Sequence, residues 1–71
     1  MKVAAKVRFN ASKERCEKFG ENMYLIYVQF EQDDDSPSMI TSILSRELGV
    51  PISRLEFAGF DVHKNWIFEM L

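Results

Sequence analysis

Cysteine is almost absent from this chain of 71 residues, because Cys16 is the only one. A single cysteine cannot form an internal disulfide bond, so we expect a fold held by its core and a reducing, cytoplasmic location. Long apolar runs are also missing. No run approaches the roughly 20 residues of a membrane-spanning helix, and the first residues lack the continuous apolar core of a signal peptide. We therefore expect a cytoplasmic protein that has no membrane segment.

An excess of charge of one sign is missing as well. Nine Lys and Arg residues against eleven Asp and Glu residues give a net charge of −2. Proteins that bind nucleic acids through their overall charge usually have a clear basic excess. The composition therefore argues against general nucleic-acid binding, although it leaves room for a local basic surface.

Apolar residues, in contrast, are sufficient for one small core. They make up 46% of the chain and include six Phe, two Tyr and one Trp. A chain of this length buries only about 60% of the surface that its unfolded form exposes, so its stability is expected to be modest. We expect residues 1–71 to form a single domain.

A helix is predicted over residues 37–48. Ser36 is a suitable cap, and Pro37 suits the first turn, where no N–H donor is needed. Gly49 can adopt the left-handed conformation that ends a helix, and Pro51 cannot continue it. The apolar stripe at helical spacing consists of Met39, Ile40, Ile43, Leu44 and Leu48.

The rest of the chain is predicted to be extended. Residues 2–9 alternate between apolar and polar, which is typical of a half-buried strand. Residues 23–30 are apolar on both sides, and further strands are predicted over residues 54–60 and 66–71. Residues 13–19 fit either a helical turn or a strand, and the turn-forming residues 20–22 favour the strand.

These elements predict a two-layer α+β domain with one helix packed on a mixed β-sheet. The order is β(β)βαββ, where the brackets mark the ambiguous second strand. The ubiquitin-like grasp is a second comparison, because it also alternates two strands, a helix and two strands. The chain ends at Leu71 with no flexible diglycine tail, so a ubiquitin-like protein of this sequence would be an adaptor and not a conjugated modifier.

Two regions of the sequence resemble a known family. They are Lys6-Val7-Arg8-Phe9-Asn10-Ala11-Ser12-Lys13, and Leu48-Gly49-Val50-Pro51 with Ser53 and a strand that runs into Gly59. Together they resemble the YggU-like family of small uncharacterised proteins, and the resemblance implies the same α+β fold. Family members carry Gly-Lys-Ala-Asn where this chain has Asp34, Asp35, Ser36 and Pro37, and a Ser-Arg-x-Lys cluster where it has residues 61–65. The resemblance therefore implies a fold and no inherited site.

The densest acidic cluster is a candidate cation site. It consists of Glu31, Asp33, Asp34 and Asp35, and hard cations prefer several carboxylate oxygens. The spacing matches no calcium loop, and acidic residues before a helix also interact favourably with its N-terminus. We favour this structural role and predict no metal site and no cofactor.

Cys16 and His63 are the two residues that could supply a nucleophile and a base, or two metal ligands. They have no recognised spacing, and no third group can be assembled around them. A lone cysteine usually packs as a small apolar residue. We therefore expect no catalytic residues and a protein that is not an enzyme.

Basic residues share one face of the first strand, namely Lys2, Lys6 and Arg8. With Lys64, Arg54 and the aromatic rings they could form a basic, stacking surface for nucleic acid. A solvated strand face explains the same pattern, and the acidic net charge favours that explanation.

Apolar residues in excess of one core suggest an interaction surface. A helix covers only one face of a sheet, while residues 23–30 are apolar on both. We predict that the face opposite the helix binds a protein partner or a second copy of the chain. The candidate residues are Met23, Leu25, Tyr27 and Trp66, and Tyr24 is a further aromatic candidate. A non-catalytic binding module is thus the expected function, with weak nucleic-acid binding as the alternative.

Overall fold

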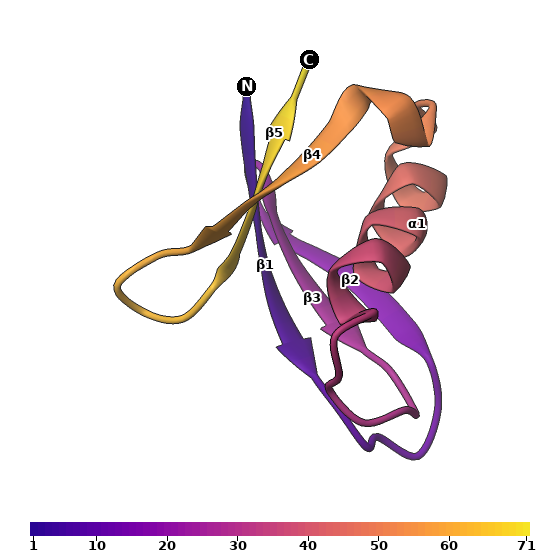
Figure 1. Ribbon diagram of the computed structural model, residues 1–71. Coiled ribbons are helices and arrows are strands. Elements are labelled where there is room, and N and C mark those ends of the chain that lie inside the picture. Colours follow the sequence, from indigo (N-terminus) through magenta and orange to yellow (C-terminus); the bar gives the residue numbers. More distant parts are fainter.

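Five strands form one mixed sheet in the computed structural model, which describes residues 1–71. The strands are β1 (Lys2–Arg8), β2 (Arg15–Gly20), β3 (Met23–Tyr27), β4 (Leu55–Phe60) and β5 (Trp66–Met70). Their spatial order is β2-β3-β1-β5-β4 (Figure 1). β1 is the central strand; it runs parallel to β3 and antiparallel to β5, while β2–β3 and β4–β5 are antiparallel pairs.

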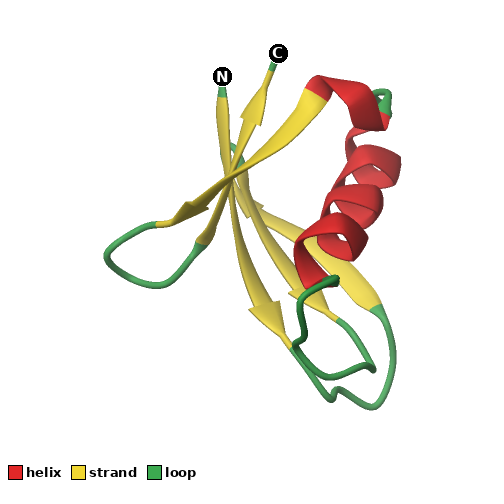
Figure 2. Cartoon of the chain, in the orientation of Figure 1, coloured by secondary structure: helices red, strands yellow, loops and turns green.

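One helix covers one face of this sheet. Helix α1 (Ser36–Leu48) connects β3 to β4, and the short 3-10 turn η1 (Ile52–Arg54) leads into β4. Figure 2 shows the helix on one side of the strands, with no second helix on the other. The predicted two-layer α+β architecture is confirmed. Three strands precede the helix, which differs from the two-strand beginning of the ubiquitin-like grasp.

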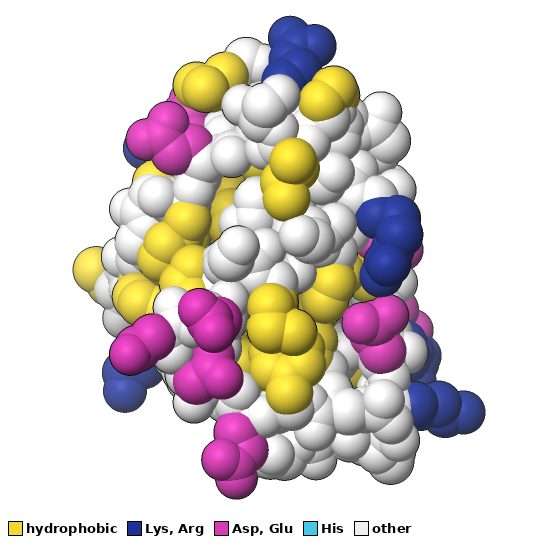
Figure 3. Space-filling view, turned by 45° about the vertical axis from the view of Figure 1, so that its right-hand side comes forward, with side chains coloured by type: hydrophobic (Ala, Val, Ile, Leu, Met, Phe, Trp, Pro, Cys, Tyr) yellow, Lys and Arg dark blue, Asp and Glu magenta, His cyan; other side chains and the backbone are white.

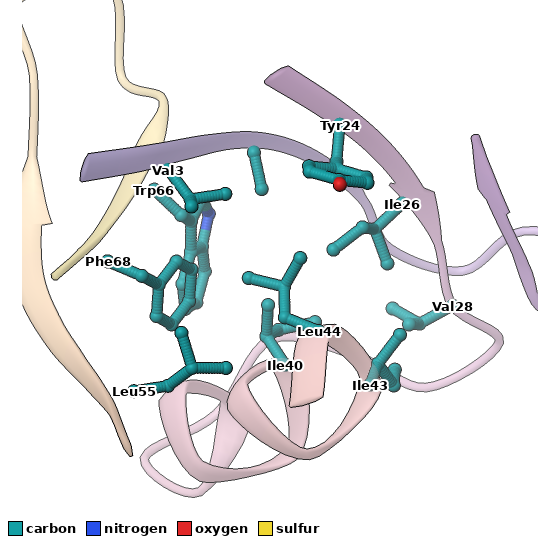
Figure 4. Close-up of a cluster of buried hydrophobic side chains, with 11 residues drawn as sticks. Val3, Tyr24, Ile26, Val28, Ile40, Ile43, Leu44, Leu55, Trp66 and Phe68 are labelled. Atoms are coloured by element: carbon teal, nitrogen blue, oxygen red, sulfur yellow. The ribbon is translucent and has the colours of Figure 1, made fainter. Parts of the chain in front are cut away.

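The core lies between α1 and the covered face of the sheet. Alternation along β1 and β3 directs Val3, Tyr24 and Ile26 toward the helix, and Ile40 and Leu44 point back at them (Figure 4). The buried hydrophobic cluster consists of Val3, Ala5, Tyr24, Ile26, Val28, Ile40, Ile43, Leu44, Leu55, Trp66 and Phe68. Met39, which belongs to the predicted apolar stripe, is 42% exposed and lies at its border.

The second strand resolves the ambiguity in the sequence. Residues 15–20 pair with β3 as an antiparallel strand, as the turn residues favoured. Asn22 has a φ of 58°, which the following hairpin turn requires and which Asn tolerates. β3 ends at Tyr27, three residues before the predicted end. Val28 nevertheless stays attached to β1, because its N–H donates to the carbonyl oxygen of Arg8 at 2.9 Å.

The start of the helix differs from the prediction. Asp35 occupies the N-cap position and makes no side-chain capping bond, so Ser36 is not the cap. Ser36 is instead fully buried, and its hydroxyl oxygen accepts the N–H of Asp33 at 2.8 Å. The hydroxyl group thus satisfies a donor of the preceding loop, which folds back over the first turn of the helix.

The end of the helix agrees with the prediction. Gly49 has a φ of 68°, and its N–H donates to the carbonyl oxygen of Ser45. A Cβ atom at this position would meet no heavy atom within 4 Å. Any penalty for a larger residue must therefore come from the backbone conformation and not from a steric clash.

We predict that Gly49→Val lowers the free energy of unfolding by roughly 1–2 kcal/mol, the cost of a left-handed conformation for a residue with a Cβ atom. Gly49→Asn should cost less, because Asn tolerates this conformation. Urea unfolding of both variants and the wild type measures the difference. Equal values for the two variants would contradict the proposed role of the backbone conformation.

No helix of the structure combines the length and the hydropathy needed to cross a bilayer.

Candidate functional site

The face of the sheet away from α1 carries a contiguous group of apolar side chains. Met23 lies beside Ala4 in the register of β3 and β1, and Ala4 lies beside Ile67 of β5. Leu25 and Tyr27 extend the group along β3. All five side chains are half-buried. We call this group (Ala4, Met23, Leu25, Tyr27 and Ile67) the open-face patch; it contains three of the four predicted interaction residues.

Charged side chains border the open-face patch on both sides. Leu25 lies between Lys6 of β1 and Glu17 of β2, and Tyr27 lies between Arg8 and Arg15. The Arg15 guanidinium carbon is 5.8 Å from the centre of the Tyr27 ring, and the same guanidinium forms an ion pair with Glu17. Along β3 the patch is therefore a narrow apolar strip between charged rims.

Trp66 does not belong to this surface. It lies opposite Ala5 in the register of β5 and β1, and Ala5 faces the helix. Trp66 is consequently only 4% exposed, and its ring centre lies 5.9 Å from that of Phe9 and 5.2 Å from that of Phe57. The prediction of Trp66 as a surface anchor was wrong, because a strand apolar on both sides does not reveal which side is buried. Tyr24 is buried as well.

The acidic cluster forms the exposed loop before α1. The carboxylate of Asp33 accepts the N–H of Asp35 at 2.9 Å and lies 3.4 Å from the Ser36 hydroxyl. No three side chains of the types His, Cys, Asp and Glu converge anywhere in the chain. In the view of Figure 3, acidic side chains gather in the lower left, among separate areas of hydrophobic side chains.

Cys16 and His63 lie in different parts of the sheet. Cys16 is in the edge strand β2, whereas His63 lies in the loop between β4 and β5, on the other side of the spatial order. Burial, together with the nearby Glu47, raises the pKa of the Cys16 thiol to about 11. The thiol is therefore protonated at neutral pH, and the structure does not bring the two side chains together.

A second surface lies where β1 extends beyond β5. The pairing of these two strands ends at Ala5 and Trp66, whereas the pairing of β1 with β3 continues to Arg8. Figure 1 shows the end of β1 and the β4–β5 loop diverging from this point. A pocket of about 210 Å³ lies between them, lined by Lys6, Val7, Arg8, His63, Lys64 and Asn65. We call it the β1 slot.

The β4–β5 loop forms the wall of the β1 slot opposite β1, and Asp61 holds this loop in its conformation. One carboxylate oxygen accepts the backbone N–H groups of His63 and Asn65 at 2.8 and 2.9 Å, and the other accepts the Asn65 side-chain amide at 2.9 Å. These bonds hold the pKa of Asp61 below its usual value. They also support the positive φ of 63° at Lys64. The backbone of this loop is thus bonded to itself and not to β1.

An apolar groove of about 430 Å³ adjoins the β1 slot. Its lining residues are Val7, Phe9, Gln32, Phe60, Lys64 and Trp66, and we call it the aromatic groove. Phe60 is 54% exposed, and its ring packs edge-on against Trp66 at 5.1 Å. Val7 and Lys64 line both pockets, which therefore meet at the unpaired end of β1.

The basic residues predicted as a stacking surface are brought together only in part. Lys6, Arg8 and Lys64 line the β1 slot, and none of them takes part in an ion pair. Lys2 lies instead opposite Glu69, and Arg54 donates to the backbone carbonyl oxygen of Leu71. The basic surface is thus a local one at the end of β1.

The roles of Phe9 and Phe60 were not recognised in the sequence. Each looks like an ordinary strand or core residue there. Besides the basic residues, the sequence signal near the site is the Asp61 to Asn65 spacing, which suits a side-chain-stabilised turn.

Comparisons with protein-family models, with curated proteins and with solved structures found no match. The resemblance to the YggU-like family therefore stays a prediction.

Proposed function

We propose that this protein is a non-catalytic, cytosolic binding module whose open-face patch contacts another protein, in the first instance a second copy of the chain. The observation that carries the proposal is the contiguous row of half-buried apolar side chains on the sheet face that no helix covers. Exposed apolar surface of this kind is typical of protein contacts.

Self-association is the simplest way to cover this patch. In a two-fold dimer each copy presents the same strip to the other, so one contact covers both. The rims of the strip carry both signs of charge, with Lys6 and Arg8 on one side of β3 and Glu17 on the other. A face with both signs can pair with itself without a build-up of like charge.

We predict that Leu25→Glu abolishes self-association, because it places a charge at the centre of the strip. Sedimentation velocity at several concentrations should show an increase in the sedimentation coefficient for the wild type and none for this variant. Met39→Glu is the control, since Met39 is an exposed apolar residue on the helix, away from the open-face patch. A wild type that stays monomeric at all concentrations, or a Leu25→Glu variant that associates normally, would contradict the proposal.

Nucleic-acid binding is the second candidate. Lys6, Arg8 and Lys64 have no ion-pair partners and lie close to the exposed ring of Phe60, and cations beside aromatic rings suit single strands. Fluorescence anisotropy with a labelled single-stranded oligonucleotide tests it: binding that weakens steeply with salt would support this candidate.

A further inference from the structure

We propose that the unpaired end of β1 binds an extended, acidic segment of a partner protein, which adds a short strand in the β1 slot. This site adjoins the open-face patch, whose rim includes Lys6 and Arg8, but the argument for it does not depend on the function proposed above. Strand addition at a free sheet edge is an established mode of peptide recognition.

The backbone of β1 leaves one residue unpaired in the slot. The backbone groups of the even-numbered residues of β1 point toward β3 and the residues next to it. The Ala4 N–H donates to the carbonyl oxygen of Asn22, and the Arg8 carbonyl oxygen accepts the Val28 N–H. Residues with odd numbers face β5, as the bond from Met70 N–H to Met1 O shows. Because strand backbone groups alternate in direction, the N–H and C=O of Val7 face the slot. No residue of β5 or of the β4–β5 loop is paired with Val7.

The two pockets determine the side chains that the added strand would carry. A residue directly opposite Val7 has its side chain on the same face as Val7, where the aromatic groove lies. The residues before and after it point to the other face, beside Lys6 and Arg8. The site therefore fits the alternating pattern acidic, bulky apolar, acidic.

The charges around the site support this pattern. Lys6, Arg8 and Lys64 have no ion-pair partners, and no carboxylate lines either pocket. The nearby carboxylate of Asp61 is occupied by the loop that it holds. A free backbone edge matches the alternating N–H and C=O groups of an extended polypeptide, and a nucleic acid has no such row of groups. The combination of edge and charge thus favours an acidic peptide.

The test uses the capped pentapeptide Ser-Glu-Leu-Glu-Ser and the ¹⁵N-labelled protein. Titration should shift the amide resonances of Val7 and Lys64 more than those of Leu25 and Tyr27. The reordered peptide Ser-Glu-Glu-Leu-Ser has the same composition and charge, and should bind more weakly because its alternation is broken. Methylation of the leucine N–H should abolish binding, because in an antiparallel pair, the orientation of β5 beside β1, that group would donate to the carbonyl oxygen of Val7.

Charge reversal tests the side-chain contacts. Lys6→Glu/Arg8→Glu should weaken binding about tenfold and should bind Ser-Lys-Leu-Lys-Ser instead, because two opposite-charge pairs are exchanged. Lys2→Glu/Lys13→Glu is the matched control, with the same change in net charge outside the slot. Phe60→Ala should also weaken binding, and its exposed position means that the fold should persist.

Several results would overturn the proposal. One is that the resonance shifts are confined to the open-face patch. Another is that the reordered or the N-methylated peptide binds as tightly as Ser-Glu-Leu-Glu-Ser. A third is that no resonance shifts at millimolar concentrations of Ser-Glu-Leu-Glu-Ser. Shifts at the slot caused by a short oligothymidylate, with none caused by the peptide, would assign the site to nucleic acid. A protein that fails to self-associate but binds the peptide would leave this proposal intact and contradict only the function of the open-face patch.

Discussion

Leu44→Ala should lower the free energy of unfolding by about 2–5 kcal/mol. Leu44 is fully buried at the centre of the contact between α1 and the sheet (Figure 4). Truncation removes buried apolar surface and leaves a cavity that neighbouring side chains fill only partly. Since α1 is the only helix on the sheet, no other element can compensate.

The loss is large compared with the total stability. The free energy of unfolding of small domains is roughly 5–15 kcal/mol, and short chains lie at the low end of this range. The melting temperature should therefore fall by about 8–40 °C, at about 4–8 °C per kcal/mol for a chain of this size. Thermal and urea unfolding followed by circular dichroism measure the change. Met39→Ala, on the exposed side of the same helix, should stay within about 0.5 kcal/mol of the wild type; similar values for the two variants would contradict the observed helix orientation.

The sequence contained enough information for the fold because the local patterns agree with the tertiary contacts. Alternation in residues 2–9 predicted β1, whose odd-numbered residues lie on the side of the sheet that the helix covers. The stripe and the stop signal at Gly49 predicted α1 and its left-handed end. In both cases the side-chain period determines the buried face, so a residue-by-residue pattern is sufficient.

The sequence pattern was insufficient where it allowed two local structures equally well. Asp35 and Ser36 are both suitable caps, and the loop decided between them when Asp33 bonded to the Ser36 hydroxyl. Residues 66–71 are apolar on both sides, and only the register with β1 placed Trp66 on the covered face. Such choices depend on contacts between distant segments, which periodicity does not describe.

The β1 slot was not predictable for the same reason. It exists because β5 begins opposite Ala5, while β1 continues for three more residues. That overhang is set by pairing register and by the Asp61 bonds that turn the β4–β5 loop away. The basic residues were visible in the sequence, but neither the free backbone edge nor the adjacent groove could be inferred from it.

The position of Trp66 leads to the second large effect. Trp66→Ala should lower the free energy of unfolding by about 3–5 kcal/mol, because its buried ring connects two parts of the structure. On one side it contacts Phe9, just after β1; on the other it contacts Phe57 and Phe60 of β4. Its loss would leave the β4–β5 hairpin attached to the rest of the sheet with a cavity at their junction.

Phe60→Ala is the matched control, since Phe60 packs on Trp66 but is largely exposed. Its effect should be at most about 1 kcal/mol, the typical size for a partly exposed contact. Urea unfolding of both variants separates a core role from a surface role. If Trp66→Ala unfolded like the wild type and lost only ligand binding, Trp66 would be a surface anchor, as its sequence context first suggested. A large loss for Trp66→Ala with a small one for Phe60→Ala would place the boundary of the core between these two rings.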